Sequence, residues 1–457
     1  MTAAGAPGPV DSGDHKGGVR AALGGLTTRG RSFLAAGVAA ALCSYVLGQG
    51  DLLRVGLLLA ALPLVSVAVL YHCRYRVAGS RRLSPPRVPA GSEARVYLRT
   101  DNISKLPTGL LMLQDRVPYA LGPRPRFVLD RVEPGGSREV SYRVRSDLRG
   151  RYPLGPLQLR LSDPFGMCEL TRSFSAYDTL VVVPRTEPLP PLRPAGDAAG
   201  HGDGSQRSLA SAGEDDIIPR GYRHGDDLRR VHWRSTARYG ELMVRREEQP
   251  QRARCTVLLD SRRTAYLGAG PDSAFEWAVS GAASALAHML ERGFAVRLVT
   301  DCGEVVPGGG ADGFASPAQD SADSAGLMTD TLAALGHSAG DDGLSRAYDV
   351  LRGSSGGLLV AFFGDLDEEQ TMVAARMRQR GGTAVAFVLD SADWERGAAA
   401  EASGSGRAGR LRTLREAGWT AVAVPPGAAL TDVWRQAGET HSGALPGATT
   451  GFSGGWS

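Results

Sequence analysis

Two apolar runs near the N-terminus constrain the fold of this chain more than any other feature. Residues 33–48 are apolar or small throughout, and residues 55–71 are apolar except at Pro63 and Ser66. A helix needs about 17 to 25 such residues to cross the hydrocarbon core of a bilayer, so each run is near the lower limit. Because a backbone within lipid must satisfy its own hydrogen bonds, the pair predicts a transmembrane helical hairpin. A buried helix pair in a soluble core and a cleaved signal peptide are the competing interpretations.

Basic residues lie on the outer flanks of this pair, whereas the loop between the runs carries only Asp51 and Arg54 as charged residues. By the positive-inside rule, both flanks then lie in the cytoplasm. We therefore expect a two-pass protein of the cell membrane, anchored in the lipid bilayer, with both termini and all folded domains in the cytoplasm. Leu42 is too bulky to precede a lipoprotein cysteine at Cys43. The flanking residues are Lys16, Arg20, Arg29 and Arg31 before the first run, and Arg74, Arg76, Arg81, Arg82 and Arg87 after the second.

Length, charge and cysteine usage exclude several other classes. The 457 residues are too many for one ordinary domain, and the formal net charge of +4 is too small to indicate nucleic-acid binding. The five cysteines form no CxxC pair, which argues against a zinc or thioredoxin-like site. Such spacing predicts unpaired, mostly buried thiols in a reducing compartment.

Polarity alternates with a period of two over about a hundred residues after the hairpin. The runs 94–98, 139–144 and 157–161 each present one apolar and one polar face, as half-buried strands do, and 179–184 follows as a last strand. These runs predict an immunoglobulin-like all-β sandwich. The whole predicted division is a disordered tail at 1–31, two transmembrane helices at 32–73, the β-sandwich at 83–185, a linker at 186–214, an arginine-rich segment at 215–250, an α/β domain at 253–440 and a disordered tail at 441–457.

Strand and helix patterns alternate in the C-terminal half, which predicts a mostly parallel sheet covered on both faces. Ligands of such folds bind at the carboxyl ends of the strands, where Asp260 and Asp365 fall. The predicted strands are 256–260, 295–299, 358–363, 384–389 and 421–424, the predicted helices are 273–292, 368–380 and 407–417, and 304–323 is predicted as a surface loop.

The stretch 215–248 interleaves eight arginines with acidic residues. Its pattern predicts a helix over 226–239, which Gly240 ends as a left-handed cap. Three interpretations are open: a phosphate or nucleic-acid surface, an ion-pair network that docks the segment onto the next domain, and a docking surface for another protein. The acidic residues oppose the first, and Tyr222 and Trp233 would be aromatic anchors in the last.

This stretch resembles the signature of a bacterial family, the domain of unknown function 58. The pattern is approximately R-x-Y-x-x-G-D-x-x-R-x-I-x-W-x-x-x-A-R-x-x-x-L-x-V-R. A second resemblance lies in the β region, where RGRYPLGP at 149–156 and DPFGM at 163–167 are similar to further family elements. The matching signature positions are Arg220, Tyr222, Gly225, Asp226, Arg229, Trp233, Ala237, Arg238, Leu242, Val244 and Arg245.

The resemblance implies a membrane protein with a von Willebrand factor type A-like domain and no established enzymatic activity. It also implies partners: genes of this family commonly lie beside those of MoxR-type AAA+ ATPases, and transglutaminase-like membrane proteins often accompany them. A type A domain places a metal site at the sheet edge, with the motif Asp-x-Ser-x-Ser, whose oxygens suit magnesium. Here the motif reads Asp260-Ser261-Arg262-Arg263-Thr264, with arginine at the first serine position and Thr264 at the second.

A guanidinium at Arg262 would repel a divalent cation and could pair with Asp260 or Asp365 instead. We therefore expect no cofactor, and carboxylates held by arginine rather than a Mg²⁺ site. Two function classes follow: a non-enzymatic membrane adaptor for an ATPase, docking through the signature residues, and a ligand- or metal-binding receptor at the edge formed by Asp260 and Asp365. An enzyme using His224 or His232 is a more distant third.

Overall fold

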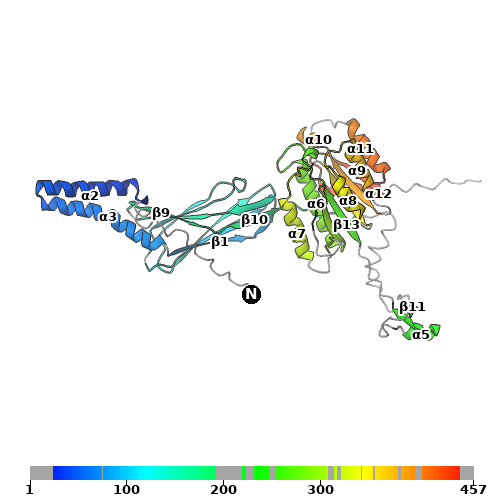
Figure 1. The fold of residues 1–457 in the computed structure, drawn as a ribbon, viewed down its shortest axis with the longest axis horizontal. Helices are drawn as coiled ribbons and strands as arrows, with labels where there is room; N and C mark the ends of the chain where they lie inside the picture. Colours follow the sequence, from blue (N-terminus) through cyan, green and yellow to red (C-terminus); the bar gives the residue numbers. More distant parts are fainter. Residues whose placement is uncertain are drawn as a thin grey trace, which may run out of the picture. The chain divides into compact units, whose positions relative to one another are not determined.

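The structure is a computed structural model whose chain divides into two compact units, 1–183 and 184–457, each described here by itself (Figure 1). The first holds two apolar helices and a β-rich region, and the second holds an α/β domain. The structure describes residues 24–74, 76–105, 107–163, 165–191, 219–222, 231, 233–245, 253–306, 313–315, 321–340, 342–353, 356–378, 382–396 and 404–442. Residues 443–457 of the predicted C-terminal tail and most of the tail at 1–31 lie outside these ranges, whereas residues 441–442 belong to the last helix.

The two N-terminal helices, α2 (Thr28–Leu47) and α3 (Gly50–Arg74), pack side by side as an antiparallel pair (Figure 1). Both are long and apolar enough to cross a membrane, which confirms the two predicted helices. Small residues let the backbones approach closely: a Cβ added to Gly37 would lie 2.6 Å from the Ala60 nitrogen, and one added to Gly56 would lie 2.8 Å from the Ala41 nitrogen. Such small-residue contacts are typical of helix pairs in lipid.

The β-rich region surrounds one hydrophobic core. A three-stranded sheet has the order β1-β3-β6, a four-stranded sheet has the order β5-β4-β8-β9, and a small sheet has the order β2-β10-β7. Strand β3 shows the predicted alternation, with Ala94, Val96 and Leu98 buried between exposed neighbours. The bounds are β1 Val77–Ser84, β2 Arg87–Pro89, β3 Glu93–Asn102, β4 Leu110–Asp115, β5 Arg126–Leu129, β6 Ser137–Arg145, β7 Gly150–Leu154, β8 Leu157–Ser162, β9 Glu169–Phe174 and β10 Asp178–Val183.

The β-rich region begins earlier than predicted and shares its core with the second helix. Strand β1 starts at Val77, six residues before the predicted boundary at 83, because it pairs in register with β3 from Val77 to Ser84. Val67 and Leu70 of α3 are buried in the same core as the strands. The last turns of α3 therefore pack against the strands, which accounts for the apolar residues at this end of the run.

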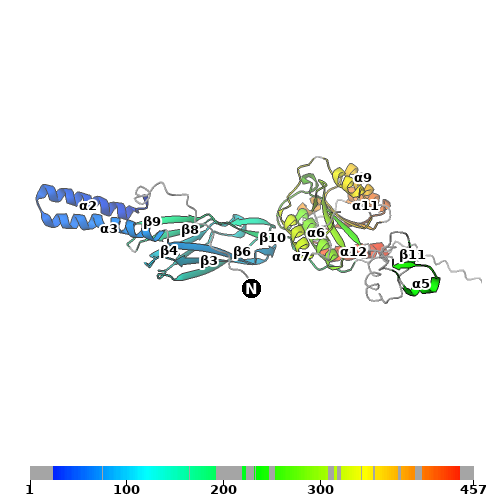
Figure 2. The ribbon, with the colours of Figure 1, turned by 60° about the horizontal axis from the view of Figure 1, so that its bottom comes forward.

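Backbone contacts join the start of α2 to the family element 163–167, which we call the DPFG turn. The Thr27 N–H donates to the carbonyl of Met167 at 2.9 Å, and the Thr27 hydroxyl donates to the carbonyl of Gly166 at 2.7 Å. Gly30 lies so close to Met167 that an added Cβ would overlap its carbonyl oxygen. In Figure 2, β9, which follows the turn, lies at the base of the helix pair. The DPFG turn thus fastens the helix pair to the strands.

The α/β domain is built on a six-stranded sheet with the order β15-β14-β13-β16-β17-β18, parallel except for the edge strand β15. The observed β16 and β17 coincide with the predicted runs, and the other three predicted strands differ by one or two residues at an end. The bounds are β13 Arg254–Leu259, β14 Ala295–Thr300, β15 Val305–Val306, β16 Leu358–Phe363, β17 Ala384–Leu389 and β18 Thr420–Val424.

Helices cover both faces of this sheet (Figures 1 and 2). One core packs α6 (Ala274–Glu291), α7 (Ser321–Ala334) and α12 (Leu430–Ser442) against one face, and a second packs α8 (Ser345–Arg352), α9 (Glu368–Arg376) and α11 (Gly404–Glu416) against the other. The short helices η3 (Arg263–Ala265) and α10 (Ser391–Arg396) follow β13 and β17. Ser273 caps α6 through a hydrogen bond from the Glu276 N–H, as a serine before an apolar run predicts.

Three local predictions need correction. The predicted loop 304–323 contains β15, whose Val306 is buried, and its last residues begin α7. The start of the predicted linker packs onto the α/β domain: Leu189 is buried in its core, and the Trp434 indole N–H donates to the carbonyl of Pro190 at 2.9 Å. Of the four cysteines with described side chains, all free thiols, only Cys168 and Cys255 are buried.

Candidate functional site

Four parallel strands of the α/β sheet end in an aspartate at the same edge. Asp260 follows β13, Asp301 follows β14, Asp390 follows β17, and Asp365 comes two residues after β16. The strand order reverses between β13 and β16, because β13 connects to β14 on one side while β16 lies on its other side. This reversal is where ligands bind in open α/β sheets. The structure thus brings the two predicted carboxylates, Asp260 and Asp365, to the predicted edge.

Arg262 fills the centre of this edge and pairs with Asp260. The guanidinium donates from Nε to Oδ1 at 2.9 Å and from Nη2 to Oδ2 at 2.7 Å, and the same Nη2 donates to the Asp365 carbonyl at 3.2 Å. Both partners are buried, with side-chain exposures of 7% for Arg262 and 0% for Asp260. The ion pair predicted from the sequence is therefore present.

Backbone N–H groups complete the environment of Asp260. The N–H of Arg262 donates to Oδ1 at 3.1 Å, and that of Gly364 donates to Oδ2 at 3.3 Å. Burial raises the pKa of the Asp260 carboxyl, and the hydrogen bonds and charge of Arg262 oppose that rise. A buried carboxylate with these donors has its lone pairs occupied, which leaves little for a metal ion.

Hydroxyl groups hold two of the other carboxylates. Asp301 is buried and accepts hydrogen bonds from the Ser261 N–H at 2.9 Å and from the Ser261 and Ser338 hydroxyls. Asp365 is half-buried and accepts hydrogen bonds from the N–H and hydroxyl of Ser391. A ligand in solvent could therefore reach the Asp365 carboxylate at this edge. Among the described residues, no arginine side chain binds this carboxylate.

Two of the four aspartates were not predicted as site residues. Asp390 pairs with Arg410 at 3.3 Å, and Asp301 belongs to the hydroxyl cluster described above. The signal was available, since both residues directly follow a buried strand, as Asp260 does. Thr264, expected to stand in for a metal-binding serine, is exposed on η3. Within the described ranges, no cluster of three or more His, Cys, Asp or Glu side chains is arranged to hold a metal ion.

Tyr266 adds a buried hydroxyl beside these carboxylates. Its ring lies against Gly364, where an added Cβ would be 2.9 Å from the ring carbon that bears the hydroxyl. The hydroxyl has no hydrogen-bond partner in the described part of the chain. Burial, followed by the charge of Asp260, raises the pKa of Tyr266 well above its ordinary value, so the phenol stays protonated.

The signature segment folds locally into a small β-pair with a helix. Strands β11 (Pro219–Gly221) and β12 (Met243–Arg245) pair antiparallel, and the Tyr222 N–H donates to the carbonyl of Leu242 at 2.7 Å. Helix α5 (Trp233–Tyr239) lies between them, so the structure describes a helix only over the second half of the predicted 226–239, and Gly240 follows it with φ +75° as predicted.

Helix α5 exposes aromatic and basic side chains together. Trp233 is 70% exposed and Tyr239 is 65% exposed, and Arg234 and Arg238 are exposed on the same helix. Arg220 and Arg245 lie on the paired strands, and Tyr222 is half-buried beside them. The remaining predicted signature residues, Gly225, Asp226 and Arg229, lie outside the described residues, as do His224 and His232.

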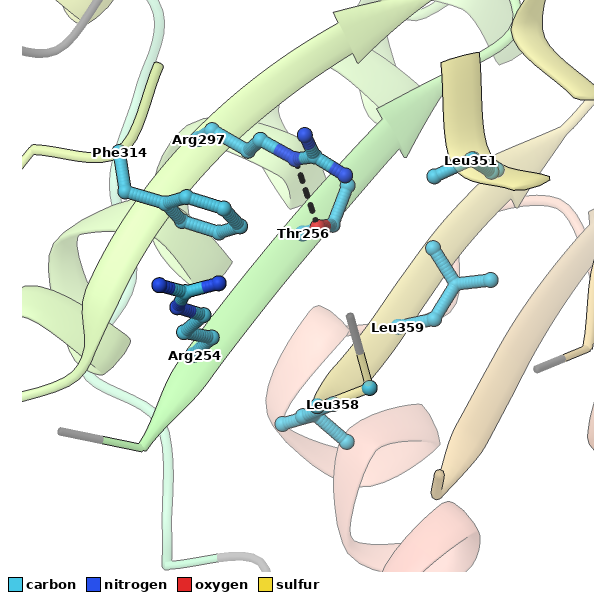
Figure 3. Close-up of a pocket in the computed structure, with 9 residues that line it drawn as sticks. Arg254, Thr256, Arg297, Phe314, Leu351, Leu358 and Leu359 are labelled. Atoms are coloured by element: carbon cyan, nitrogen blue, oxygen red, sulfur yellow. Dashed lines mark hydrogen bonds between the residues drawn. The ribbon is translucent and has the colours of Figure 1, made fainter. Parts of the chain in front are cut away.

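A small cavity lies on the sheet face near the starts of β13 and β16 (Figure 3). The guanidinium groups of Arg254 and Arg297 lie 5.2 Å and 4.5 Å from the centre of the Phe314 ring, and Arg297 donates to the Thr256 hydroxyl at 3.0 Å. The cavity has a volume of about 20 Å³, which holds about one water molecule. This volume is too small for a substrate or cofactor.

Comparison with known proteins finds a family match over part of the chain. Residues 219–385, from β11 through the signature segment into β17, match the family model described as "Protein of unknown function DUF58". An uncharacterized protein, YeaD, of Bacillus subtilis (strain 168) is 27% identical over 274 residues, which are 57% of this chain and 65% of that protein. The chain therefore spans just under two thirds of the length of this relative.

Two solved structures that are similar to this chain match a short part of it. The CARDB domain of a Pyrococcus furiosus protein is 12% identical, covering 23% of this chain and 87% of that chain with a TM-score of 0.18. The ApaA protein from Bordetella pertussis is also 12% identical, covering 23% of this chain and 91% of that chain with a TM-score of 0.18. Similarity at this level carries no argument about function.

Proposed function

We propose that this protein is a non-enzymatic, membrane-anchored adaptor that recruits an ATPase through the signature segment. The observation that carries the proposal is the exposure of Trp233 on α5 beside Arg234 and Arg238. Tryptophan, tyrosine and arginine are the side chains most enriched at the energetic centres of protein interfaces. Among the partners implied by the family, a MoxR-type AAA+ ATPase fits this role, with a transglutaminase-like membrane protein as a companion.

The two apolar helices supply the membrane anchor in this proposal. Exposed Arg29 and Arg31 at the start of α2, together with Arg76 after α3, support a hairpin whose two ends face the cytoplasm. We infer further that the β-rich region is an immunoglobulin-like sandwich and that the α/β domain is a degenerate von Willebrand factor type A-like domain. Support for the second inference comes from Asp260 at the reversal of strand order, with Arg262 where the type A motif has serine.

Co-purification of the full-length protein from membranes of its native host tests the adaptor. We expect mass spectrometry to identify a MoxR-type ATPase, and Trp233→Ala to lower its recovery at least tenfold, since a central tryptophan contributes roughly 2 kcal/mol or more. Tyr119→Ala is the control, because Tyr119 is an exposed aromatic residue of the β-rich region, away from the signature segment in the sequence. Equal recovery with Trp233→Ala, or no ATPase at all, contradicts the proposal. Protease access to the α/β domain in sealed inside-out vesicles of the same preparation checks the orientation.

A rival function is a receptor for a ligand or divalent metal at the Asp260/Asp365 edge. The half-buried Asp365 carboxylate at the reversal of strand order favours it. Arg262 opposes a metal, because its guanidinium already occupies the carboxylate of Asp260. We expect calorimetric titration of the full-length protein with Mg²⁺, Mn²⁺ and Ca²⁺ to give no heat of binding. Saturable heat with any of the three ions would favour the receptor over the adaptor.

A further inference from the structure

A groove of about 400 Å³ opens between helix α3 and the DPFG turn. Leu58, Leu62, Val65 and Val69 of α3 form its floor, and Phe165 of the turn forms one wall. Its size is in the range of pockets that bind small molecules, roughly 300–1,000 Å³. The groove is thus apolar and runs along a helix proposed to cross the membrane, with Phe165 of the DPFG turn among its lining residues.

The position of the groove along α3 places the DPFG turn near the membrane surface. Val67 and Leu70 are buried in the core of the β-rich region, so the bilayer must end near Ser66. The part of the groove from Leu58 to Val65 then lies at the depth of acyl chains. Phe165 of the DPFG turn is 61% exposed and would lie near this surface, the level where aromatic side chains gather in membrane proteins.

Positive charge lies beside the DPFG turn, which contributes Phe165 to the groove. Arg29, in the first turn of α2, has Nη1 at 3.8 Å from the position of a Cβ added to Gly166, so its guanidinium reaches the DPFG turn. Arg29 and Arg31 are exposed, and neither forms an ion pair within the described residues. A guanidinium matches a phosphate group in geometry and charge.

Asp163, the acidic residue of the turn, bonds to the backbone of the turn and not to these arginines. Asp163 also lines the groove, but it is buried and accepts hydrogen bonds from the Cys168 N–H at 2.7 Å and the Phe165 N–H at 3.2 Å. Its carboxylate therefore shapes the turn. The turn positions Phe165 beside α3 and holds the start of α2, with Arg29, against Gly166.

We propose that this groove binds an anionic phospholipid, with one acyl chain along α3 beneath Phe165 and the phosphate against Arg29. The inference rests on the membrane anchoring proposed above, and it gives the DPFG turn a second role besides joining the helices to the strands. Charge complementarity selects a phospholipid over an apolar helix of a partner, because such a helix carries no anion for Arg29.

Lipid retention by the full-length protein tests this proposal. The protein is purified in mild detergent, exposed to an equimolar mixture of phosphatidylglycerol and phosphatidylcholine, and analysed by native mass spectrometry. We expect preferential retention of phosphatidylglycerol, with the preference falling roughly tenfold in Arg29→Gln, as for the loss of a charge-assisted hydrogen bond. Val65→Trp should fill the groove and abolish retention. The matched control is Leu57→Trp on the same helix, because Leu57 is 58% exposed and does not line the groove.

Separate outcomes distinguish failure of the lipid site from failure of the anchor. Wild-type protein that is extracted from liposomes by carbonate has no membrane anchor, and both proposals then fall. Protein that stays inserted but retains both lipids equally, in wild type and in Arg29→Gln, overturns only the lipid site. A co-purifying membrane protein that Val65→Trp displaces would assign the groove to a partner helix and overturn the lipid. Labelling of α3 by phosphatidylglycerol with a photoreactive acyl chain, lost in Val65→Trp, would support it.

Discussion

Replacing Arg262 with alanine should lower the free energy of unfolding of the α/β domain by about 3–5 kcal/mol. The substitution leaves the Asp260 carboxylate, which is fully buried, without the guanidinium that binds both of its oxygens. Removing one partner of a buried ion pair costs about this much, because the remaining charge stays out of water. The hydrogen bond from Arg262 to the Asp365 carbonyl is lost as well, which loosens β13 from the end of β16.

Tryptophan fluorescence isolates this effect in the full-length protein. All six tryptophans follow residue 183, and Trp277, Trp394, Trp419 and Trp434 lie in the α/β domain. Urea unfolding in lipid nanodiscs therefore reports on that domain without a signal from the β-rich region. Arg263→Ala is the matched control, because Arg263 is the exposed neighbour and its loss should change stability by no more than about 0.5 kcal/mol. If Arg262→Ala lowers the free energy of unfolding by less than about 1 kcal/mol, the ion pair with Asp260 does not stabilise the domain as proposed.

The stability of Arg262→Ala should also depend on pH in a defined direction. Burial raises the pKa of Asp260, and removal of the opposing guanidinium raises that pKa further. A carboxyl group with a higher pKa in the folded state binds more protons there than in the unfolded state, where the pKa is about 3.9. The stability of the variant then falls as pH rises above about 3.9. The loss in the free energy of unfolding of Arg262→Ala, relative to wild type, should be smaller near pH 5 than near pH 8.

Replacing Asp115 with alanine should destabilise the β-rich region by about 3–5 kcal/mol. Asp115 forms a buried ion pair with Arg81, with side-chain exposures of 0% and 3%, and it accepts a hydrogen bond from the Tyr142 hydroxyl at 2.6 Å. Arg81 donates to Asp115 from Nε at 3.0 Å and from Nη2 at 2.5 Å. The substitution therefore leaves a buried guanidinium poorly compensated and the Tyr142 hydroxyl without its acceptor.

Hydrogen exchange measured by mass spectrometry checks this second prediction, because the β-rich region contains no tryptophan. If β3 and β6 exchange through global opening of the region, the free energy of opening measured for their amides should fall by about the predicted 3–5 kcal/mol. Asp147→Ala is the control, because its ion pair with Arg145 at 3.1 Å is about half exposed and should contribute less than about 1 kcal/mol. Unchanged protection in Asp115→Ala would mean that other contacts hold the strands together.

Arg81 shows that a basic residue near an apolar run in the sequence need not contribute to the positive charge at the membrane surface. The sequence places Arg81 among the basic residues after the second apolar run, where it counts toward membrane orientation. In the structure it is buried in the β-rich region, where Gly155 of the RGRYPLGP element lets its guanidinium approach within 3.1 Å of an added Cβ. Sequence distance from a membrane helix therefore does not decide whether a charge faces the lipid surface or a protein core.

The sequence by itself determined the order of the elements and carried the resemblance to a family. Apolar length predicted two helices, period-two alternation predicted strands such as β3, and alternating strands and helices predicted the mostly parallel sheet. These signals are local, because a helix or strand shows its buried face in the spacing of its own residues. The pairing of Arg262 with an edge carboxylate was also predictable, since the two residues are neighbours in one motif.

Only the tertiary structure decided which distant residues meet. Asp301 and Asp390 joined the sheet edge because parallel strands in register end together, which no single strand reveals. The DPFG turn met the start of α2 although about 140 residues separate them, and the last part of the apolar run of α3 joined the core of the β-rich region. Contacts between such residues depend on how complete elements pack, and chain spacing carries no record of that packing.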